Sequence, residues 1–185
     1  PIYAPERELA MLQARREEAA KAGISPQLIE DVLRRFMRES YSNENQFGFK
    51  TLNPAINKIV IVGGYGKMGQ LFARYLRASG YPISILDRDD WDVAERILTN
   101  ADVVIVSVPI DHTLETIERL KPYLTENMLL ADLTSVKRAP LAKMLDVHKG
   151  AVVGLHPMFG PDIASMAKQV VVRCDGRFSE RYEWL

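Results

Sequence analysis

Cysteine and net charge are both scarce in this chain. Among 185 residues there is one cysteine, Cys174, and a single cysteine cannot form a disulfide within the chain. That composition suits a reducing compartment, so we expect a cytoplasmic protein. Lysine plus arginine and aspartate plus glutamate number 24 each, which gives a formal net charge of zero. No long-range field therefore favours nucleic acid or an anionic membrane as a partner, and we expect neither.

Long apolar runs are also missing. The longest, such as Ile59–Val62 and Val103–Val106, are far shorter than the roughly 20 residues that span a bilayer. The N-terminus has no basic segment followed by an apolar one, so no signal peptide is predicted. The chain begins with Pro1 instead of methionine, and it stops within "SERYEWL", where Ser179 is placed to cap a helix. We therefore expect a fragment of a longer protein.

The first 57 residues predict a small helical part and a linker. Residues 5–22 are rich in Ala, Glu, Arg and Leu, which favours a helix. Ser25 and Pro26 form the N-cap and first position of a second helix, which runs to about residue 44. Residues 45–57 contain glycine and proline and break the periodicity, so they predict a linker. The apolar residues of the second helix fall on one stripe: Leu28, Ile29, Val32, Leu33, Phe36 and Met37.

The rest of the chain alternates short apolar runs with helical segments. The predicted strands are 58–62, 82–87, 102–106, 128–132, 151–155 and 169–174. The predicted helices between them are 67–79, 91–99, 111–120 and 138–145. This alternation indicates an α/β fold, a doubly wound parallel sheet with helices on both faces. With 47% hydrophobic and 26% charged residues, the composition is ordinary for a soluble globular domain.

The first strand runs directly into the glycine-rich stretch "VGGYGKMGQ". Gly64, Gly66 and Gly69 give G-x-G-x-x-G between a strand and a helix, a context that indicates a Rossmann-type dinucleotide site. We expect Gly64 to allow the tight turn, Gly66 the approach of a pyrophosphate to the helix N-terminus, and Gly69 the packing of helix on strand. The predicted cofactor-binding segment also includes Tyr65, Lys67 and Met68. A glycine-rich turn without a ligand is the alternative.

The second predicted strand ends at Asp87, 23 residues after Gly64. An acid at this place accepts hydrogen bonds from ribose hydroxyls and repels a 2′-phosphate, which favours NAD over NADP. Arg88 follows directly and is able to pair with a phosphate, so both residues are predicted cofactor contacts. A surface acid in a turn is the alternative for Asp87. We predict no metal site.

Polar residues follow the later strands at the edge where open α/β sheets bind their ligands. They lie in "SVPID" (107–111), "DLTSVK" (132–137) and "GLHPMFGPD" (154–162). Ser107 and Pro109 are predicted to contact the cofactor. The side chains expected to converge near a nicotinamide are Ser107, Ser135, Lys137 and His156. A plain turn serine, a solvated lysine and a core histidine are the alternatives.

Several segments in order carry a resemblance to a known family. They are "IVIVGGYGKMGQLFARYLRASGY", "VIVSVPI", "LADLTSVK", "GLHPMFGPD" and "AKQVVVRCDGR", together with "PIYAPERE" and "DVLRRFMRESYSNEN" near the N-terminus. They resemble the bacterial T-proteins, the fused chorismate mutase/prephenate dehydrogenases of tyrosine biosynthesis. The likeness covers essentially the whole chain.

The resemblance implies that prephenate is oxidatively decarboxylated to 4-hydroxyphenylpyruvate, with NAD as hydride acceptor. His156 would accept a hydrogen bond from the ring hydroxyl and pull on its proton as hydride leaves. Ser107 would contact this histidine and the substrate or nicotinamide, and Lys137 would lie near the site. Asp162 falls where many relatives carry a glutamate thought to gate the pocket, and its shorter side chain leaves that role open.

The resemblance also divides the chain. Residues 1–46 would be the C-terminal part of an all-α chorismate mutase domain, 47–57 a linker, and 58–185 the NAD-binding domain. The first mutase helix and a C-terminal helical domain would lie outside the chain, so we expect the 185 residues alone to be nearly inactive.

The mutase part would bind the chorismate-derived skeleton. Arg7 and Glu8 match the family's Arg-Glu pair, and Ser40 and Glu44 fall near its last active-site positions. Mutase pockets of this family use helices from two chains, which implies a homodimer with chorismate and prephenate as substrates. Charges on a solvated first helical turn are the alternative for Arg7 and Glu8.

Two other functions stay open on the sequence. One is an arogenate dehydrogenase, or another NAD-dependent dehydrogenase of the β-hydroxyacid type. The other is a non-catalytic NAD-binding regulatory module. The joint presence of Ser107, Lys137 and His156 argues against the module, because a sensor needs the glycine loop but no proton acceptor.

Overall fold

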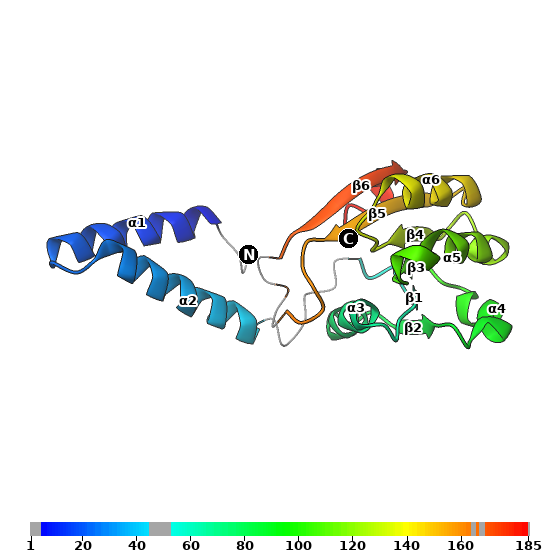
Figure 1. Cartoon of the computed structure of the whole chain (residues 1–185), viewed down its shortest axis with the longest axis horizontal. Coiled ribbons are helices and arrows are strands. Elements are labelled where there is room, and N and C mark those ends of the chain that lie inside the picture. The colour runs from blue at the N-terminus through cyan, green and yellow to red at the C-terminus, as the bar shows by residue number, and fades with distance from the viewer. Residues whose placement is uncertain (1–4, 45–52, 164–165, 167–168, 185) are drawn as a thin grey trace. The chain divides into compact units, whose positions relative to one another are not determined.

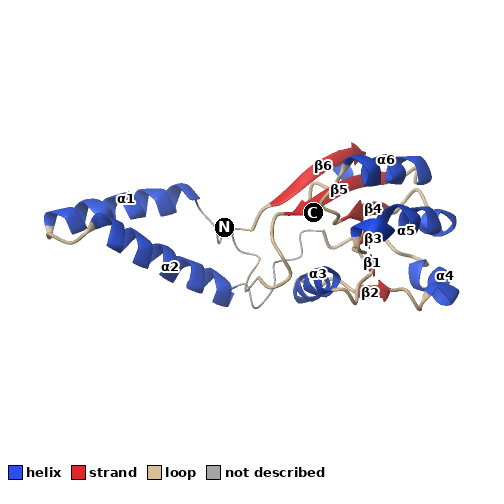
Figure 2. Ribbon diagram, viewed as in Figure 1, coloured by secondary structure: helices blue, strands red, loops and turns tan. Residues whose placement is uncertain are grey.

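The computed structural model describes residues 5–44, 53–163, 166 and 169–184, with side chains of residues 9–37 described in its helical part. The chain forms two compact units, residues 1–46 and 47–185 (Figure 1). In its described residues the first unit is helical, and the second combines a sheet with helices (Figure 2). The predicted combination of two helices followed by an α/β sheet is therefore confirmed.

The first unit is a pair of helices, α1 (Pro5–Lys21) and α2 (Pro26–Glu44). Gly23 lies between them with a φ of 71°, in the left-handed region that glycine adopts at least cost. The Ser25 hydroxyl oxygen accepts the backbone N–H of Leu28 at 3.3 Å, so Ser25 caps α2 as predicted.

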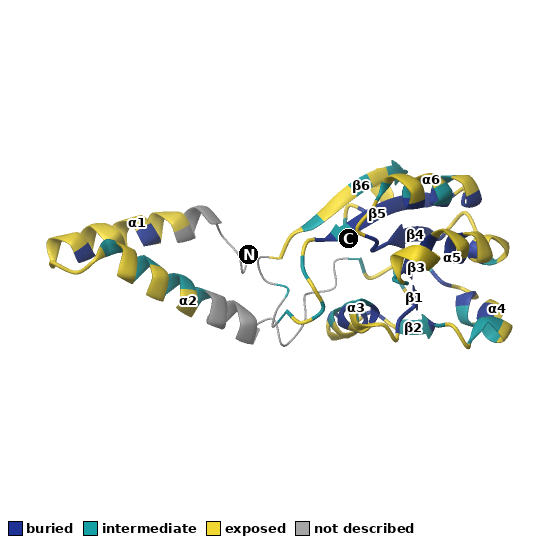
Figure 3. Cartoon of the chain, in the orientation of Figure 1, coloured by how far each residue is buried: buried dark blue, intermediate teal, exposed yellow. Residues whose placement is uncertain are grey.

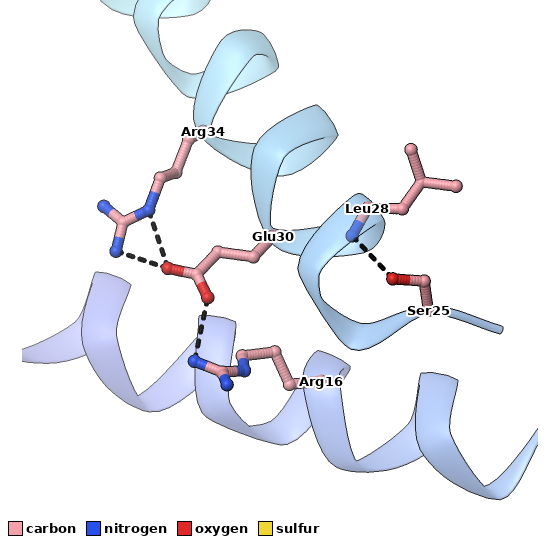
Figure 4. A network of polar contacts seen from close by, with 5 residues as sticks. All are labelled: Arg16, Ser25, Leu28, Glu30 and Arg34. Carbon is pink, nitrogen blue, oxygen red and sulfur yellow. Dashed lines mark hydrogen bonds and ion pairs between the residues drawn. The ribbon is translucent and has the colours of Figure 1, made fainter.

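The two helices are joined by buried apolar side chains and by one charged cluster. Leu12 and Ala19 of α1 are 3% and 5% exposed. The carboxylate of Glu30 on α2 accepts hydrogen bonds from Arg16 of α1 at 2.9 Å and from Arg34 at 2.7 Å (Figure 4). Glu30 therefore connects the two helices while its own helix supplies the second arginine.

The second unit is built on a six-stranded sheet with the order β2-β1-β3-β4-β5-β6. Its first five strands are parallel, and β6 is antiparallel to β5. The strands are β1 (Ile59–Val62), β2 (Ile83–Leu86), β3 (Val103–Val106), β4 (Leu129–Asp132), β5 (Ala151–Pro157) and β6 (Val171–Arg177). The helices are α3 (Lys67–Ala78), α4 (Ala94–Leu98), α5 (Thr113–Leu120) and α6 (Arg138–Val147), with short 3₁₀ turns η2 (Trp91–Val93), η3 (Ile110–His112), η4 (Lys121–Tyr123) and η5 (Ser179–Arg181).

Both faces of the sheet are covered by helices. Successive side chains of a strand point to opposite faces, so β1 contributes Val60 to the core beneath α4, α5 and α6, and Ile61 to the core beneath α3. Figure 3 shows β3 and β4 as buried, β6 as exposed to intermediate, and the outer surfaces of the helices as exposed. Burial on both faces explains why the parallel strands are continuous apolar runs.

The last strand departs from the predicted parallel order. A parallel connection needs a crossover of about a dozen residues, usually with a helix. No helix occurs in the described part of residues 158–170, and β6 returns beside β5 in the opposite direction. The predicted helices 91–99 and 111–120 also begin differently, because each starts with a 3₁₀ turn before α4 and α5.

Candidate dinucleotide site

The left-handed conformation of the glycine loop falls on Gly63, one residue before the glycine predicted to allow the tight turn. Gly63 has a φ of 79°, whereas Gly64 has no positive φ. A Cβ on Gly63 would lie 2.7 Å from the carbonyl oxygen of Ser107 and 2.8 Å from a methyl of Val108. Gly64 follows inside the same turn, which the N–H of Gly66 closes on the carbonyl oxygen of Gly63 at 3.1 Å, so the structure adds Gly63 to the predicted turn glycine. Among the described glycines of this loop, Gly63 combines a left-handed conformation with a contact to Ser107 and Val108, directly after β3, that excludes a side chain.

The other glycines pack the loop against its neighbours. A Cβ on Gly64 would lie 2.8 Å from the side chain of Ile85, and one on Gly69 would lie 2.6 Å from the carbonyl oxygen of Gly63. Gly69 therefore allows α3 to approach the loop, as predicted. Gly66 is the N-cap of α3 and makes no side-chain cap, which leaves the first N–H groups of the helix facing outward as a site for an anion.

Asp87 closes the loop from the end of β2. One carboxylate oxygen, Oδ2, accepts the backbone N–H of Tyr65 at 2.9 Å, and Oδ1 accepts the N–H of Arg88 at 2.8 Å. The N–H of Asp87 itself donates to a carboxylate oxygen of Asp90 at 2.9 Å. These contacts hold the carboxylate beside the glycine loop with lone pairs left for further donors.

A hollow of ≈ 370 Å³ lies between the glycine loop and the ends of β2 and β3. It brings together five predicted cofactor contacts, namely Gly66, Asp87, Arg88, Ser107 and Pro109. Its remaining lining residues were missed in the sequence: Val62, Gly63, Trp91, Val108, His112, Glu115 and Thr116. The guanidinium of Arg119 lies 4.0 Å from the ring centroid of Trp91, which supports that wall. Their position in the sequence was the available signal, because Trp91 and His112 come shortly after β2 and β3, the two strands that flank β1.

The other residues predicted in the cofactor-binding loop do not line this hollow. Tyr65 and Lys67 line a second hollow along α3, of ≈ 570 Å³, together with Asp162. Met68 is half-buried and lines neither hollow. Asp162, the predicted gate, is exposed, and the structure does not bring it to the hollow of Ser107.

His156 is part of β5, and the strand extends past the predicted end to Pro157. Its side chain is half-buried, and it pairs with Val172 of β6. Neighbouring strands lie about 4.8 Å apart, so β3 with Ser107 at its end and β5 lie roughly 10 Å apart across β4. Neither His156 nor Lys137 lines the hollow described above. A group seated over the end of β4 would have Ser107 and His156 on either side.

Lys137 points inward instead of into solvent. Its ammonium donates to Asp132 Oδ2 at 2.6 Å and to the carbonyl oxygen of Leu155 at 2.7 Å. Burial lowers the pKa of Lys137 below its usual value, and the hydrogen bond and charge of Asp132 oppose that shift. Asp132 was not among the predicted site residues, although a carboxylate ending an apolar strand in "LLADLTSVK" was a visible signal.

The predicted mutase residues Arg7, Glu8, Ser40 and Glu44 fall on α1 and α2, but their side chains lie outside the described residues. In the described ranges, no three His, Cys, Asp or Glu side chains are grouped to hold a metal ion. No helix in that part of the chain has the length and apolar character required to span a membrane.

The fold and this edge of the sheet define a class of protein. A parallel, doubly wound sheet carries a glycine loop into the N-terminus of α3, and an acid ends the neighbouring strand. This arrangement is that of a dinucleotide-binding α/β domain.

Comparison with known proteins gives the family. A family model for the nucleotide-binding domain of prephenate dehydrogenase matches residues 78–177, and one for type II chorismate mutase matches residues 1–45. The chain belongs to the prephenate dehydrogenase family. The glycine loop precedes the matched residues of the first model, so its assignment depends on the geometry above.

Relatives and solved structures agree with this family. The chain is 87% identical over 185 residues to the T-protein of Haemophilus influenzae and 58% identical over 184 residues to that of Enterobacter agglomerans. It is covered completely in both cases and spans 49% of each relative, about half their length. A prephenate dehydrogenase from A. aeolicus, solved with hydroxyphenyl propionate and NAD+, shares the fold with a TM-score of 0.57 at 21% identity, over 69% of this chain and 54% of that one. The resemblance to T-proteins is thus confirmed.

Proposed function

We propose that the chain belongs to a bifunctional enzyme of tyrosine biosynthesis. Its first reaction isomerises chorismate to prephenate, and its second oxidatively decarboxylates prephenate to 4-hydroxyphenylpyruvate with NAD. The observation that supports this most is the hollow that joins the glycine loop, Asp87 and Ser107, in a chain 87% identical to a T-protein over its whole length.

The residues at the hollow fit NAD. A Cβ on Gly63 or Gly69 would collide with backbone, so the loop is closed too tightly for side chains at these positions. The N–H groups of Gly63, Tyr65 and Gly66 bond within the protein, which leaves the first N–H groups of α3 for an anion. The N-terminus of α3 would hold the pyrophosphate, and Asp87 would accept the ribose hydroxyls. Arg88, Ser107 and Pro109 would complete the contacts, with Tyr65, Lys67 and Met68 as the loop's other members. When bound, NAD supplies the acceptor for a hydride.

The chain's own residues would accept and return the proton of the substrate's ring hydroxyl. We assign His156 as the group whose ring nitrogen accepts the proton of the substrate's ring hydroxyl. Hydride leaves the carbon that bears that hydroxyl, carbon dioxide leaves the opposite ring carbon, and the ring becomes aromatic. The proton then returns from His156 to the phenolic oxygen. Ser107 would hydrogen-bond the imidazole and substrate, and Lys137 would supply positive charge beside them. Asp162 is retained as a candidate gate.

The helical part would carry half of a mutase pocket. In this assignment residues 1–46 belong to the mutase domain, 47–57 form a linker and 58–185 the NAD-binding domain. Arg7, Glu8, Ser40 and Glu44 would contact the chorismate-derived skeleton. The rearrangement breaks no bond to the protein, so charge placement and a held conformer are what the helices provide.

We also propose a cytoplasmic homodimer that binds neither nucleic acid nor membrane. The dimer is supported by a row of exposed apolar side chains on α2, where Leu28, Val32 and Phe36 are 56%, 41% and 70% exposed. Such a row on a helix favours contact with another helical segment.

The test uses the complete protein encoded by the open reading frame that contains these 185 residues. Purified protein is supplied with NAD and either prephenate or arogenate, and NADH formation is followed; chorismate consumption is measured separately. Prephenate-dependent NADH formation and loss of chorismate are expected. Faster oxidation of arogenate would identify an arogenate dehydrogenase instead, and NAD binding without oxidation of either compound would identify a regulatory module.

The His156→Asn variant tests the assignment of the proton acceptor. Removing a general base typically costs about 10²–10⁴-fold in rate, so a loss of kcat in that range is expected. NAD binding, measured by calorimetry in the same variant, should stay at the wild-type level because His156 does not line the hollow. A near wild-type rate would remove His156 from the mechanism.

A further inference from the structure

Asp132 has a buried carboxylate and lies at the edge of the sheet where the parallel strands have their carboxyl ends. It is the last residue of β4 and 0% exposed. Its Oδ2 accepts the backbone N–H of Thr134 at 3.0 Å and the ammonium of Lys137 at 2.6 Å. Its Oδ1 is also buried and has no hydrogen-bond partner in the described part of the chain.

The pair of Asp132 and Lys137 connects two strands. Lys137 precedes α6 and follows β4, yet its ammonium also reaches the carbonyl oxygen of Leu155 on β5 at 2.7 Å. That carbonyl belongs to the residue directly before His156. The backbone that carries the imidazole is therefore fixed by a charge-assisted hydrogen bond.

His156 projects from the same face of β5 that meets this pair. A Cβ on Gly154 would lie 3.0 Å from Lys137 Cδ and 3.4 Å from Asp132 Oδ1. Side chains two residues apart on a strand share a face, so Gly154 and His156 point to the same side. Because Gly154 has no side chain, it leaves the space that the Lys137 side chain fills. His156 lies two residues further along β5, toward the carboxyl end of the strand.

Stability alone does not account for this arrangement. Replacing a buried ion pair by apolar groups of similar volume is often neutral or stabilising, because both charges must leave water. Here the carboxylate is entirely buried, and one of its oxygens accepts no hydrogen bond from the residues that the structure describes, which is a further cost. An arrangement that is costly and sits one residue from His156 is better explained by a role at the site.

We propose that Asp132 is a positioning residue for His156, acting through Lys137 and the carbonyl of Leu155. The proposal rests on the proposed function, since it assumes that His156 is the proton acceptor. Asp132 touches neither substrate nor cofactor in this account. It fixes the direction of the Lys137 ammonium, which fixes the end of β5 and with it the imidazole.

The experiment is a double-mutant cycle in the complete protein, with Asp132→Asn, His156→Asn and both changes together. A displacement of about 1 Å at a catalytic group can cost roughly 100-fold in rate, so Asp132→Asn should lower kcat by about that factor, with the KM for NAD unchanged. In the His156→Asn background the same change should cost much less than in the wild type, because the histidine it positions is gone.

Asp102→Asn is the matched control. Asp102 also accepts backbone N–H groups next to a strand, those of Asn57 at 2.6 Å and Lys58 at 3.0 Å, but at the opposite edge of the sheet. It should leave kcat unchanged. If Asp132→Asn does not fold, Asp132→Glu keeps the charge and displaces the carboxylate by one methylene, and it enters the same cycle.

A second readout does not depend on the reaction. These 185 residues contain His112, His148 and His156, and with ring-labelled histidine the NMR signal of each is assigned in the complete protein as the one lost when that histidine is replaced. Asp132→Asn should shift or broaden the His156 ring resonance and leave that of His148, at the other end of the sheet, unchanged. Asp102→Asn should move neither.

The outcomes separate the two proposals. A rate loss that is the same in the wild-type and His156→Asn backgrounds, or an unchanged His156 resonance, would overturn the positioning role while the dehydrogenase assignment stands. If the wild-type protein oxidises no prephenate, the proposed function fails and the resonance decides whether Asp132 holds the histidine. A shift confined to His156 would support positioning in either case.

Discussion

Asp87 accepts the backbone N–H of Tyr65 at 2.9 Å, so the acid at the end of β2 and the glycine loop after β1 form one rigid unit. The same carboxylate is the proposed ribose acceptor. Under that proposal it would serve two purposes, because it would shape the loop for the pyrophosphate and select the sugar.

Asp87→Asn should weaken NAD use and relax discrimination against NADP. A hydrogen bond to a charged group contributes about 1.5–3 kcal/mol, so we expect KM for NAD to rise by roughly 10- to 100-fold. The KM for NADP should fall relative to the KM for NAD, since the amide no longer repels a 2′-phosphate. Steady-state kinetics of the complete protein with both cofactors measures this. Asp89→Asn is the control, because the Asp89 side chain is 92% exposed; an unchanged cofactor ratio in Asp87→Asn would contradict the assignment.

Gly63→Ala should destabilise the loop and reduce NAD binding. The φ of 79° costs a residue with a Cβ about 1–2 kcal/mol, and the new methyl would meet the carbonyl oxygen of Ser107. Thermal unfolding and calorimetric titration with NAD report the two effects. Gly160→Ala is the stability control, because a Cβ there has no atom within 4 Å. Equal melting temperatures for the two variants would show that Gly63 carries no constraint.

Glu30→Gln should lower the stability of the helical unit at neutral pH. The hydrogen bond from Arg34 lowers the pKa of Glu30 below 4.5, and Arg16 adds to the effect. A lowered folded pKa gives stability that is present above the unfolded pKa and lost as the pH falls through the folded one. The difference in melting temperature between wild type and variant should thus be present at pH 7 and shrink as the pH falls below about 4.5.

The control for this experiment is Asp31→Asn, which removes the same charge from the next, exposed residue of α2. It should change the melting temperature less than Glu30→Gln at pH 7. If the difference in melting temperature between wild type and Glu30→Gln stays the same at low pH, the ion pair does not explain it.

His148 should make the α/β domain less stable in mild acid. It is 2% exposed, and its Nε2 lies 2.9 Å from the carbonyl oxygen of Met128. Burial lowers the pKa of His148 below 6.5, because it disfavours the charged ring. The unfolded chain binds the proton more readily, so stability is lost as the pH falls below about 6.5 toward the lowered folded pKa.

Melting temperatures between pH 7.5 and pH 5 measure this loss. His148→Gln should lower stability at pH 7.5 and flatten the acid dependence below it. His112→Gln, a change at an exposed histidine, should keep the wild-type slope. If His148→Gln keeps the full slope, other groups cause the acid sensitivity.

Much of the fold could be predicted because its signals are local. Each apolar run of four or five residues between helical segments became a strand of the sheet, and Ser25 began α2 where an N-cap was expected. Gly66, Asp87 and Ser107 met at one hollow because parallel strands bring their carboxyl ends to one edge. The direction of β6 was predicted wrongly as parallel, since the composition of Val171–Arg177 is the same for a parallel or an antiparallel strand.

The sequence by itself determined the alternation of strands and helices, the glycine loop at the first strand and the acid at the end of the second. These follow from periodicity and order along the chain. Only the tertiary structure decided that Gly63 takes the left-handed conformation and that Asp132 holds Lys137 against Leu155. The reason is physical: the Ser107 carbonyl that excludes a side chain at Gly63, and the Leu155 carbonyl that receives Lys137, come from strands that are neighbours in the sheet but distant in the sequence.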